Sequence, residues 1–207
     1  MAGLAIAAPA AAQDPTGLSI RPFVMVTEQS FKAVDTFDAV FGKTYFPFFG
    51  GGVQIFVHDR FFAELTASRF RQTGERAYLS GGDAFKQAFK LGIPLTATIT
   101  PFEISGGYRF RLRQLPRVRP YAAIGYGSYA YQETSDFAQA GDDVDTKHSG
   151  YLVNGGAEFR LQRWVAVAID VQYTRVPGIL GTGGVSQQAG ESDLGGVAAR
   201  LKLVVGR

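Results

Sequence analysis

The feature that most constrains the fold is a period-two alternation that runs through residues 151–175. Within residues 151–161, apolar or small side chains alternate with Asn154, Gly156, Glu158 and Arg160. After a tight turn, Val165, Val167, Ile169, Val171 and Tyr173 again share one face. Strict alternation indicates β-strands whose two faces differ in polarity. Each strand has about 11 residues, which is the length that a tilted strand needs to cross a bilayer.

Six further stretches with strand-like alternation complete a set of eight strands: 18–29, 45–57, 61–71, 95–111, 120–132 and 194–205. The connections between strands alternate in length. Those near 30–44, 71–94, 133–149 and 177–191 are long, and those near 58–60, 112–119 and 161–163 are short. Transmembrane barrels have an even number of strands, short periplasmic turns and long extracellular loops. We therefore predict an all-β fold: an eight-stranded antiparallel up-and-down transmembrane β-barrel with short periplasmic turns and four longer extracellular loops.

Composition agrees with this fold and excludes several other classes of protein. Charged residues make up 19% of the chain, below the roughly 25% typical of soluble domains, and 26 of the 207 residues are glycine. The chain has no cysteine, which excludes disulfides and cysteine–metal chemistry. Its net charge of +3 is spread along the sequence, so we expect no nucleic-acid partner.

The first 14 residues are rich in alanine and contain Ala10-Ala11-Ala12 before Gln13. This is the small-residue pattern of a signal-peptidase site. We interpret residues 1–14 as the remnant of a truncated signal peptide and residues 15–207 as the outer-membrane β-barrel domain. In the second long connection we also expect a short helical turn around 83–90.

The polar faces of the strands predict the content of the barrel interior. A barrel of eight strands has a lumen that side chains just fill, and buried charges must be paired to be tolerated. We expect Asp170 to lie near Arg200, and Glu64 to lie near Glu103 and Arg109. The predicted lumen charge network, which has a structural role as a neutral plug, consists of Glu64, Glu103, Arg109, Glu158, Arg160, Asp170, Arg200 and Lys202. A gated polar pore through the same network is the alternative.

Aromatic residues gather near the ends of the predicted strands, where membrane barrels carry girdles at the two interfaces. Strand propensity also favours aromatic residues, so this signal is shared between two causes. The expected girdle residues are Phe61, Tyr108, Phe110, Tyr129, Tyr151, Phe159, Trp164 and Tyr173.

With these features the chain resembles the small eight-stranded outer-membrane β-barrel proteins of Gram-negative bacteria. The resemblance rests on FFAELTAS (61–68), RPYAAIGYGSY (119–129), GGAEFRL and WVAVAIDVQYTRV within 155–176, and GGVAARLKLVV (195–205). It implies location in the cell outer membrane and contact with outer-membrane lipid and lipopolysaccharide. It also implies assembly by the outer-membrane insertion machinery and a monomeric state. The last strand of such proteins usually ends on an aromatic residue, whereas here it ends at Val205.

Candidate catalytic and metal-binding residues are few. Some barrels of this kind are lipid A deacylases or acyltransferases that use a serine, a histidine and an acid. Here His58 lies in a predicted turn, and His148 directly precedes Ser149, so the two side chains point to opposite sides of a strand. Asp142, Asp143 and Asp145 could attract divalent cations but are better interpreted as a solvated loop. We therefore expect no enzyme activity, no cofactor and no metal.

Three functions remain open at this point. The first is a structural or surface-interaction role through the external loops. The second is a narrow channel for small solutes. The third is a soluble, lipocalin-like exported binding barrel with its apolar face turned inward. Periodicity alone does not say which face points outward, but the low number of charges favours the membrane.

Overall fold

A computed structural model describes residues 17–80, 87–135 and 144–206. Their strands form one closed barrel in which each strand is antiparallel to its neighbours in the sequence. Pairing of β1 with β8, with Met25 opposite Lys202, closes the barrel. The strands are β1 (Leu18–Phe31), β2 (Tyr45–Val57), β3 (Phe61–Ser80), β4 (Gln87–Arg109), β5 (Val118–Thr134), β6 (Val144–Arg160), β7 (Val165–Arg175) and β8 (Gly196–Val205).

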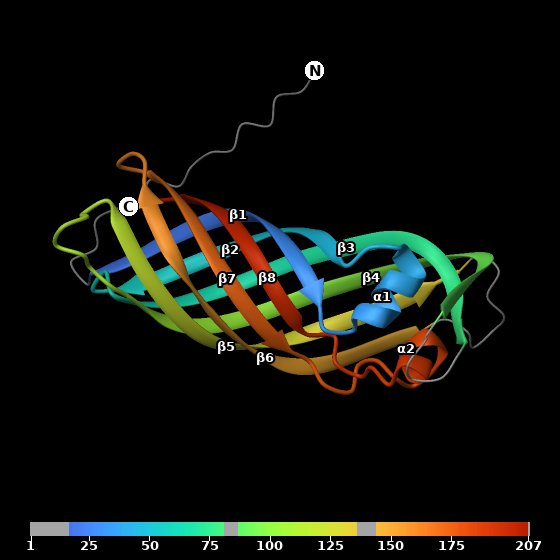
Figure 1. Ribbon diagram of the computed structural model, residues 1–207. Coiled ribbons are helices and arrows are strands. Elements are labelled where there is room, and N and C mark those ends of the chain that lie inside the picture. Colours follow the sequence, from blue (N-terminus) through green and yellow to red (C-terminus); the bar gives the residue numbers. More distant parts are fainter. Residues whose placement is uncertain (1–16, 81–86, 136–143, 207) are drawn as a thin grey trace, which may run out of the picture.

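The connections alternate between the two ends of the barrel as predicted, but their lengths differ from the prediction, since residues 110–117 separate β4 from β5 and only residues 81–86 separate β3 from β4. Figure 1 shows the three short turns, β2–β3, β4–β5 and β6–β7, at the end of the barrel opposite the helices. The connections β1–β2 and β7–β8 lie at the other end and contain the helices α1 (Val34–Phe41) and α2 (Gly184–Ala189). Within the described ranges, no helix is long and apolar enough to cross a membrane.

The second long connection differs from its prediction, because most of residues 71–94 belongs to a β-hairpin. Strands β3 and β4 pair from Phe61↔Tyr108 to Ser80↔Gln87, with an irregularity between Glu75 and Ala77. The prediction of a helical turn around 83–90 is wrong for Gln87–Lys90, because these residues belong to β4. The rest of that predicted turn, residues 83–86, lies outside the described residues. In this part of the hairpin neither face contacts lipid, so apolar and polar residues no longer alternate in the sequence. The backbone hydrogen bonds between the two strands nevertheless continue.

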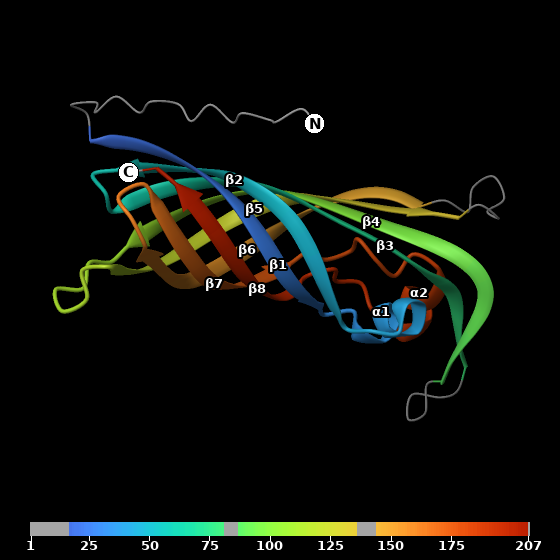
Figure 2. The same ribbon diagram turned by 90° about the horizontal axis from the view of Figure 1, so that it is seen from above.

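The third long connection is also shorter than predicted. Strand β5 runs to Thr134 and β6 begins at Val144, where Glu133↔Val144 is the last described pair. Figure 2 shows both hairpins extending beyond the body of the barrel, with the β3–β4 hairpin bent toward the helices. The barrel wall is therefore much taller on the β3–β6 side than on the β7–β8 side.

The orientation of the faces decides between a membrane barrel and a soluble one. On β8, Leu201 and Leu203 are 52% and 45% exposed, whereas Lys202 between them is 0% exposed. The same order holds on β1, where Val24 and Val26 are exposed and Met25 is buried. An apolar exterior around a charged interior would be unfavourable in water and suits lipid. This excludes the lipocalin-like alternative, whose apolar face would point inward.

Seven of the eight expected girdle residues carry side chains on the outer face, and Tyr129 is the exception. Phe61, Phe110 and Trp164 are exposed close to the short turns, and Tyr151 and Tyr173 are exposed toward the opposite end. Tyr129 is buried in the lumen because it has the same parity on β5 as Tyr121 and Ala123. Its assignment to the girdle was wrong.

The glycine run in β2 permits close packing inside the barrel. A Cβ atom at Gly52 would lie 1.9 Å from the carbonyl oxygen of Leu65 and 2.8 Å from the ring of Phe23. The absent side chain thus leaves room for the Phe23 ring in the lumen and for close approach of β3. This agrees with the general use of glycine in strands where other groups approach closely.

Candidate functional site

The lumen is the candidate site, because it collects most of the charged residues that the sequence assigned to the barrel interior. Glu64, Glu103, Arg109, Glu158, Asp170, Arg200 and Lys202 are all buried there. Arg160 is only half-buried and lies next to the short β6–β7 turn. Arg21, which was not predicted, is buried instead and completes a set of four acids and four bases inside the barrel.

At the centre of the lumen, Asp170 is held by cations from the neighbouring strand β8. Arg200 Nε donates to Asp170 Oδ1 at 2.5 Å, and Lys202 Nζ lies 3.2 Å from Asp170 Oδ2. The hydroxyl of Tyr121 donates to the same carboxylate at 2.5 Å. Lys202 Nζ also donates to Glu64 from across the lumen at 2.7 and 3.0 Å. One compact cluster thus joins β3, β5, β7 and β8.

Nearer the short turns, Glu158 lies between two arginines. Its carboxylate oxygens lie 2.9 Å from Arg21 Nη1 and 3.2 Å from Arg109 Nη1. The ring of Phe56 contacts both guanidinium groups, with centroid distances of 5.2 Å to Arg21 and 4.0 Å to Arg109. Arg109 Nη2 also donates to Asp59 Oδ1 in the β2–β3 turn at 2.9 Å. This lower cluster closes the periplasmic mouth.

Asp59 is the acid on which the arginines of this mouth converge. Its carboxylate accepts hydrogen bonds from Arg109, Arg111 and Arg119. Partial burial favours the neutral carboxyl, but the three guanidinium groups outweigh it and hold the pKa of Asp59 below its ordinary value. Asp59 therefore remains charged at neutral pH.

Glu103 lies at the end of the charged region that is farther from the short turns. It accepts a hydrogen bond from the Tyr129 hydroxyl at 2.6 Å and one from Gln172 Nε2 at 3.0 Å. Arg200 Nη1 lies 3.9 Å from Glu103 and donates to Gln172 Oε1 at short range. Arg200 therefore links the central cluster to the upper one.

Pairing across the lumen explains why Glu64 does not pair with Arg109, as the sequence had suggested. Glu64 does lie diagonally from Glu103, since Glu64 pairs with Ser105 and Thr66 with Glu103 in the β3–β4 ladder. The cation that compensates Glu64 is Lys202 on the opposite wall, however, and Arg109 binds Glu158 and Asp59 instead. In a barrel of eight strands, long side chains reach across the interior as easily as along the wall.

Several members of this network are absent from the predicted set, although their strand parity places them in the lumen. Arg21 lies between Ile20 and Pro22 in the alternating stretch 18–29, so it has the opposite parity to the apolar residues of that strand. Tyr121 and Tyr129 share a face of β5, and Gln172 shares a face of β7 with Asp170. Alternation along β1, β5 and β7 is the signal that identifies these residues as lumen residues.

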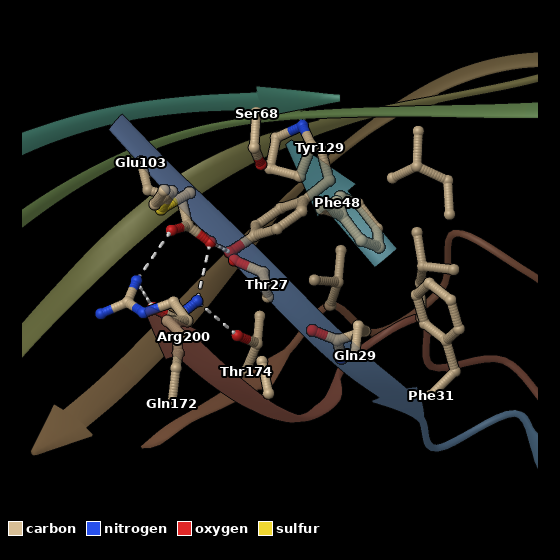
Figure 3. A pocket seen from close by; sticks show the side chains of 16 residues that line it. Thr27, Gln29, Phe31, Phe48, Ser68, Glu103, Tyr129, Gln172, Thr174 and Arg200 are labelled. Atoms are coloured by element: carbon tan, nitrogen blue, oxygen red, sulfur yellow. Dashed lines mark hydrogen bonds and ion pairs between the residues drawn. The ribbon is translucent and has the colours of Figure 1, made fainter. Parts of the chain in front are cut away.

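Above the charges lies a small cavity of about 40 Å³, which has room for a few water molecules. Figure 3 shows Glu103, Gln172 and Arg200 on one side of it and the rings of Phe31 and Phe48 on the other. Thr27 and Gln29 of β1 lie between these two groups. The cavity marks the boundary between a charged and an aromatic half of the lumen.

The aromatic half is a cap over the extracellular mouth, formed by a buried cluster that includes Phe31, Phe37, Phe46, Phe48 and Phe70. The Phe46 ring lies at its centre, with centroids 5.3 Å from Phe37 and 5.4 Å from Phe70. Phe37 belongs to α1, where Phe37 and Val40 are buried three residues apart and so share one face of the helix. The helix ends at Gly42, whose φ of 68° suits glycine.

Two acids of the β7–β8 connection hold the cap in place. Glu191 accepts hydrogen bonds from the backbone N–H groups of Asp35 and Thr36 at 3.1 and 2.8 Å, and so caps the N-terminus of α1. Asp193 accepts from the N–H groups of Val176 and Gly195 at 2.8 and 3.0 Å. Lys32 Nζ reaches Asp193 at 3.3 Å, which ties this connection to the end of β1.

A closed barrel with an apolar exterior, a charged interior and short turns at one end is the pattern of an outer-membrane protein. The family described as "Outer membrane protein beta-barrel domain" matches residues 1–201. The chain belongs to this family. As an outer-membrane β-barrel, it is located in the cell outer membrane, with the short turns on the periplasmic side.

Solved structures with the same fold have very different sequences from this outer-membrane β-barrel. OprG of Pseudomonas aeruginosa has a TM-score of 0.52 at 11% identity, covering 93% of this chain and 96% of its own. A major outer-membrane protein of Thermus thermophilus has a TM-score of 0.52 at 10% identity, covering 91% and 99%. Ail of Yersinia pestis, in complex with the heparin analogue sucrose octasulfate, has a TM-score of 0.50 at 11% identity, covering 91% and 96%. None of the curated proteins compared with the chain matches it.

The outer-membrane barrel brings no serine, histidine and acid together in its described part. His148 Nδ1 lies 3.2 Å from Thr146 Oγ1, and His58 occupies the β2–β3 turn with a φ of 50°. No group of three or more potential metal ligands occurs among the described residues. Asp145 accepts a hydrogen bond from Gln132, while Asp142 and Asp143 lie outside the described residues.

Proposed function

We propose that this protein is a non-conducting outer-membrane barrel that presents a rigid contact surface outside the cell. The filled lumen carries this proposal. Four acids and four bases neutralise one another across the barrel, and an aromatic cap closes the extracellular mouth. The cavity between them, of about 40 Å³, is smaller than the 300–1,000 Å³ typical of sites that hold small molecules.

The contact surface in this proposal is the extracellular part of the β3–β4 hairpin. Its inner side packs on the helices: Leu79 packs against the cluster of Ala39, Val40, Leu95 and Val185. The backbone N–H of Leu79 also donates to Gln188 Oε1 of α2 at 2.8 Å. These contacts hold the hairpin in the bent position seen in Figure 2.

The outer side of the same hairpin exposes a small apolar patch. Tyr78 and Phe89 are cross-strand partners and are 50% and 46% exposed, and Leu91, two residues along β4, is 56% exposed. Exposed apolar groups that cluster mark surfaces for interaction. Aromatic side chains on a rigid hairpin bind at low entropic cost. This chemistry favours an apolar partner surface over a sulfated glycan such as the one bound to Ail.

Single-channel recording in planar bilayers tests the filled lumen. The proposal expects no current steps from protein whose folding is verified by heat-modifiable migration on gels. Reproducible current steps from folded wild-type protein would contradict it and would support the narrow channel.

Partitioning of intact cells into hexadecane tests the contact surface. Cells that display wild-type protein should partition more strongly than cells that display Tyr78→Ser/Phe89→Ser/Leu91→Ser. The matched control, Thr73→Ser/Thr100→Ser, changes exposed residues of the same two strands and should behave as wild type. Equal partitioning of wild type and the triple variant would refute the apolar surface. If heparin-agarose retained the wild-type protein but not the triple variant, the patch would be assigned to binding a glycan.

A further inference from the structure

The periplasmic end of the barrel carries an unusual concentration of arginine. The three short connections and the strand residues next to them, 58–60, 110–119 and 160–164, contain seven arginines and a single acid, Asp59. The arginines are Arg60, Arg111, Arg113, Arg117, Arg119, Arg160 and Arg163. They represent a third of the 21 lysines and arginines of the whole chain. We call them the arginine ring.

Most of this positive charge is not neutralised by the protein. Asp59 pairs with Arg111 and Arg119 at 3.0 and 3.4 Å, and it also compensates Arg109 in the lumen. Across the described ranges, Arg60, Arg113, Arg117, Arg160 and Arg163 form no ion pair. Arg60, Arg113, Arg117 and Arg163 are exposed. The arginine ring therefore carries more positive charge than its one acid neutralises, and such an excess at one end of the barrel attracts anions.

Apolar side chains alternate with these arginines and place the ring at the membrane interface. In the β4–β5 connection, Leu112 and Leu115 are 41% and 55% exposed between Arg111, Arg113 and Arg117. In the β6–β7 turn, Leu161 is 62% exposed and Trp164 is 44% exposed beside Arg163, whose guanidinium lies 5.6 Å from the indole. Tryptophan prefers the level of the lipid headgroups, and arginine reaches that level with its charge while its stem contacts apolar groups.

The two arginine-rich connections are neighbours in space. The backbone N–H of Arg160 donates to the carbonyl of Arg117 at 3.0 Å, and Val118 pairs with Phe159. Arg117, Arg160 and Arg163 therefore belong to one continuous surface on the β4–β7 side of the periplasmic mouth. Figure 1 shows both connections at the end of the barrel opposite α1.

We propose that the arginine ring binds the anionic headgroups of phospholipids in the inner leaflet of the outer membrane. Guanidinium groups match phosphate oxygens in a bidentate geometry, and the interleaved leucines and Trp164 contact the adjacent lipid. A soluble periplasmic polyanion would meet the same charges, but it would not account for exposed leucines between them. This interaction is independent of the role proposed for the extracellular hairpin, because it involves the opposite end of the barrel.

The chain contains its own probe for this proposal, since Trp164 is the one tryptophan in the sequence and lies within the ring. The protein is reconstituted in phosphatidylcholine vesicles that contain increasing amounts of phosphatidylglycerol with 6,7-dibrominated acyl chains. Parallel vesicles contain brominated phosphatidylcholine. Quenching of Trp164 then gives the relative binding constant of the two lipids next to the ring.

The expected preference for phosphatidylglycerol is on the order of fivefold, and it should decrease as salt is added. Arg113→Gln/Arg117→Gln removes two exposed arginines that have no ion-pair partner in the described structure, and it should bring the preference close to one. The matched control, Arg69→Gln/Arg71→Gln, removes two exposed arginines from β3 on the extracellular side and should retain the full preference.

Three outcomes would overturn the proposal. Equal quenching by the two lipids in wild type is the first, and an equal loss of preference in the control variant is the second. The third is a wild-type protein that sediments with peptidoglycan sacculi but shows no lipid preference, when the Arg113→Gln/Arg117→Gln variant no longer sediments with the sacculi. That result would assign the ring to a periplasmic polymer. Heat-modifiable migration verifies that each variant is folded.

Discussion

The two halves of the lumen fill the same barrel by different physical means. The periplasmic half contains Asp170, Lys202 and the other paired charges, whereas the extracellular half contains the cluster of phenylalanines around Phe46. In the charged half, hydrogen bonds must have the right direction and every charge needs an opposite charge beside it, because removing one ion leaves another buried without a partner. Interactions in the aromatic half depend mainly on the volume that is filled. The first half should therefore tolerate no change of charge, and the second should respond in proportion to volume.

The largest expected effect comes from a change of charge at constant shape. Asp170→Asn removes the carboxylate that compensates Arg200 and Lys202 and should lower the free energy of unfolding by about 3–5 kcal/mol. Urea unfolding of the reconstituted protein, followed on heat-modifiable gels, measures this loss. Asp145→Asn, at an exposed position of β6, is the control and should change stability by less than about 0.5 kcal/mol. Similar values for the two variants would show that the lumen tolerates unpaired charge.

In the aromatic cap, the loss should follow the volume removed. Phe46→Ala deletes a fully buried ring and should cost about 3 kcal/mol, and Phe46→Leu, which retains more of the volume, should cost about 1 kcal/mol. The same unfolding measurement tests both variants. If Phe46→Leu were as damaging as Phe46→Ala, the cap would depend on ring geometry and the contrast between the two halves would be weaker.

An effect no larger than that of Phe46→Leu is expected at Asp193, the acid that ties the β7–β8 connection to β1. Burial raises the pKa of this carboxyl, but the N–H groups of Val176 and Gly195 and the ammonium of Lys32 outweigh it, so its pKa lies below the ordinary value. A folded-state pKa below the unfolded one means that the stabilisation is complete above about pH 4 and is lost as the pH falls through the folded-state pKa. Asp193→Asn should therefore cost about 1 kcal/mol at pH 7.

At pH 3 the difference in stability between Asp193→Asn and wild type should be smaller than at pH 7, because Asp193 of the unfolded wild-type chain then binds a proton, which favours the unfolded state. Thermal unfolding at the two pH values measures both differences. A difference that stays constant or grows on acidification would exclude the charge of Asp193 as the cause.

Much of the fold could be predicted from sequence because lipid and lumen impose opposite demands on adjacent residues. The alternation of Leu201, Lys202 and Leu203 and the order of short and long connections predicted an eight-stranded barrel, and the low number of charges favoured the membrane. Parity along β8 likewise predicted that Arg200 and Lys202 point inward. The face of a strand on which a residue lies follows from its position relative to its neighbours in the chain, so it can be read directly from the sequence.

Partners across the lumen and beyond the membrane were decided by tertiary structure alone. Lys202 meets Glu64, 138 positions away, because closure of the barrel brings β8 opposite β3. Glu191 caps a helix that begins at Val34, and the β3–β4 hairpin extends through residues whose pattern predicts a loop. The period-two pattern was enough to predict which side chains share a face of a strand, since that demand acts on every second residue, whereas the structure showed which face meets lipid. Barrel closure and the packing of the cap determined which side chains meet, because those contacts join residues far apart in the chain.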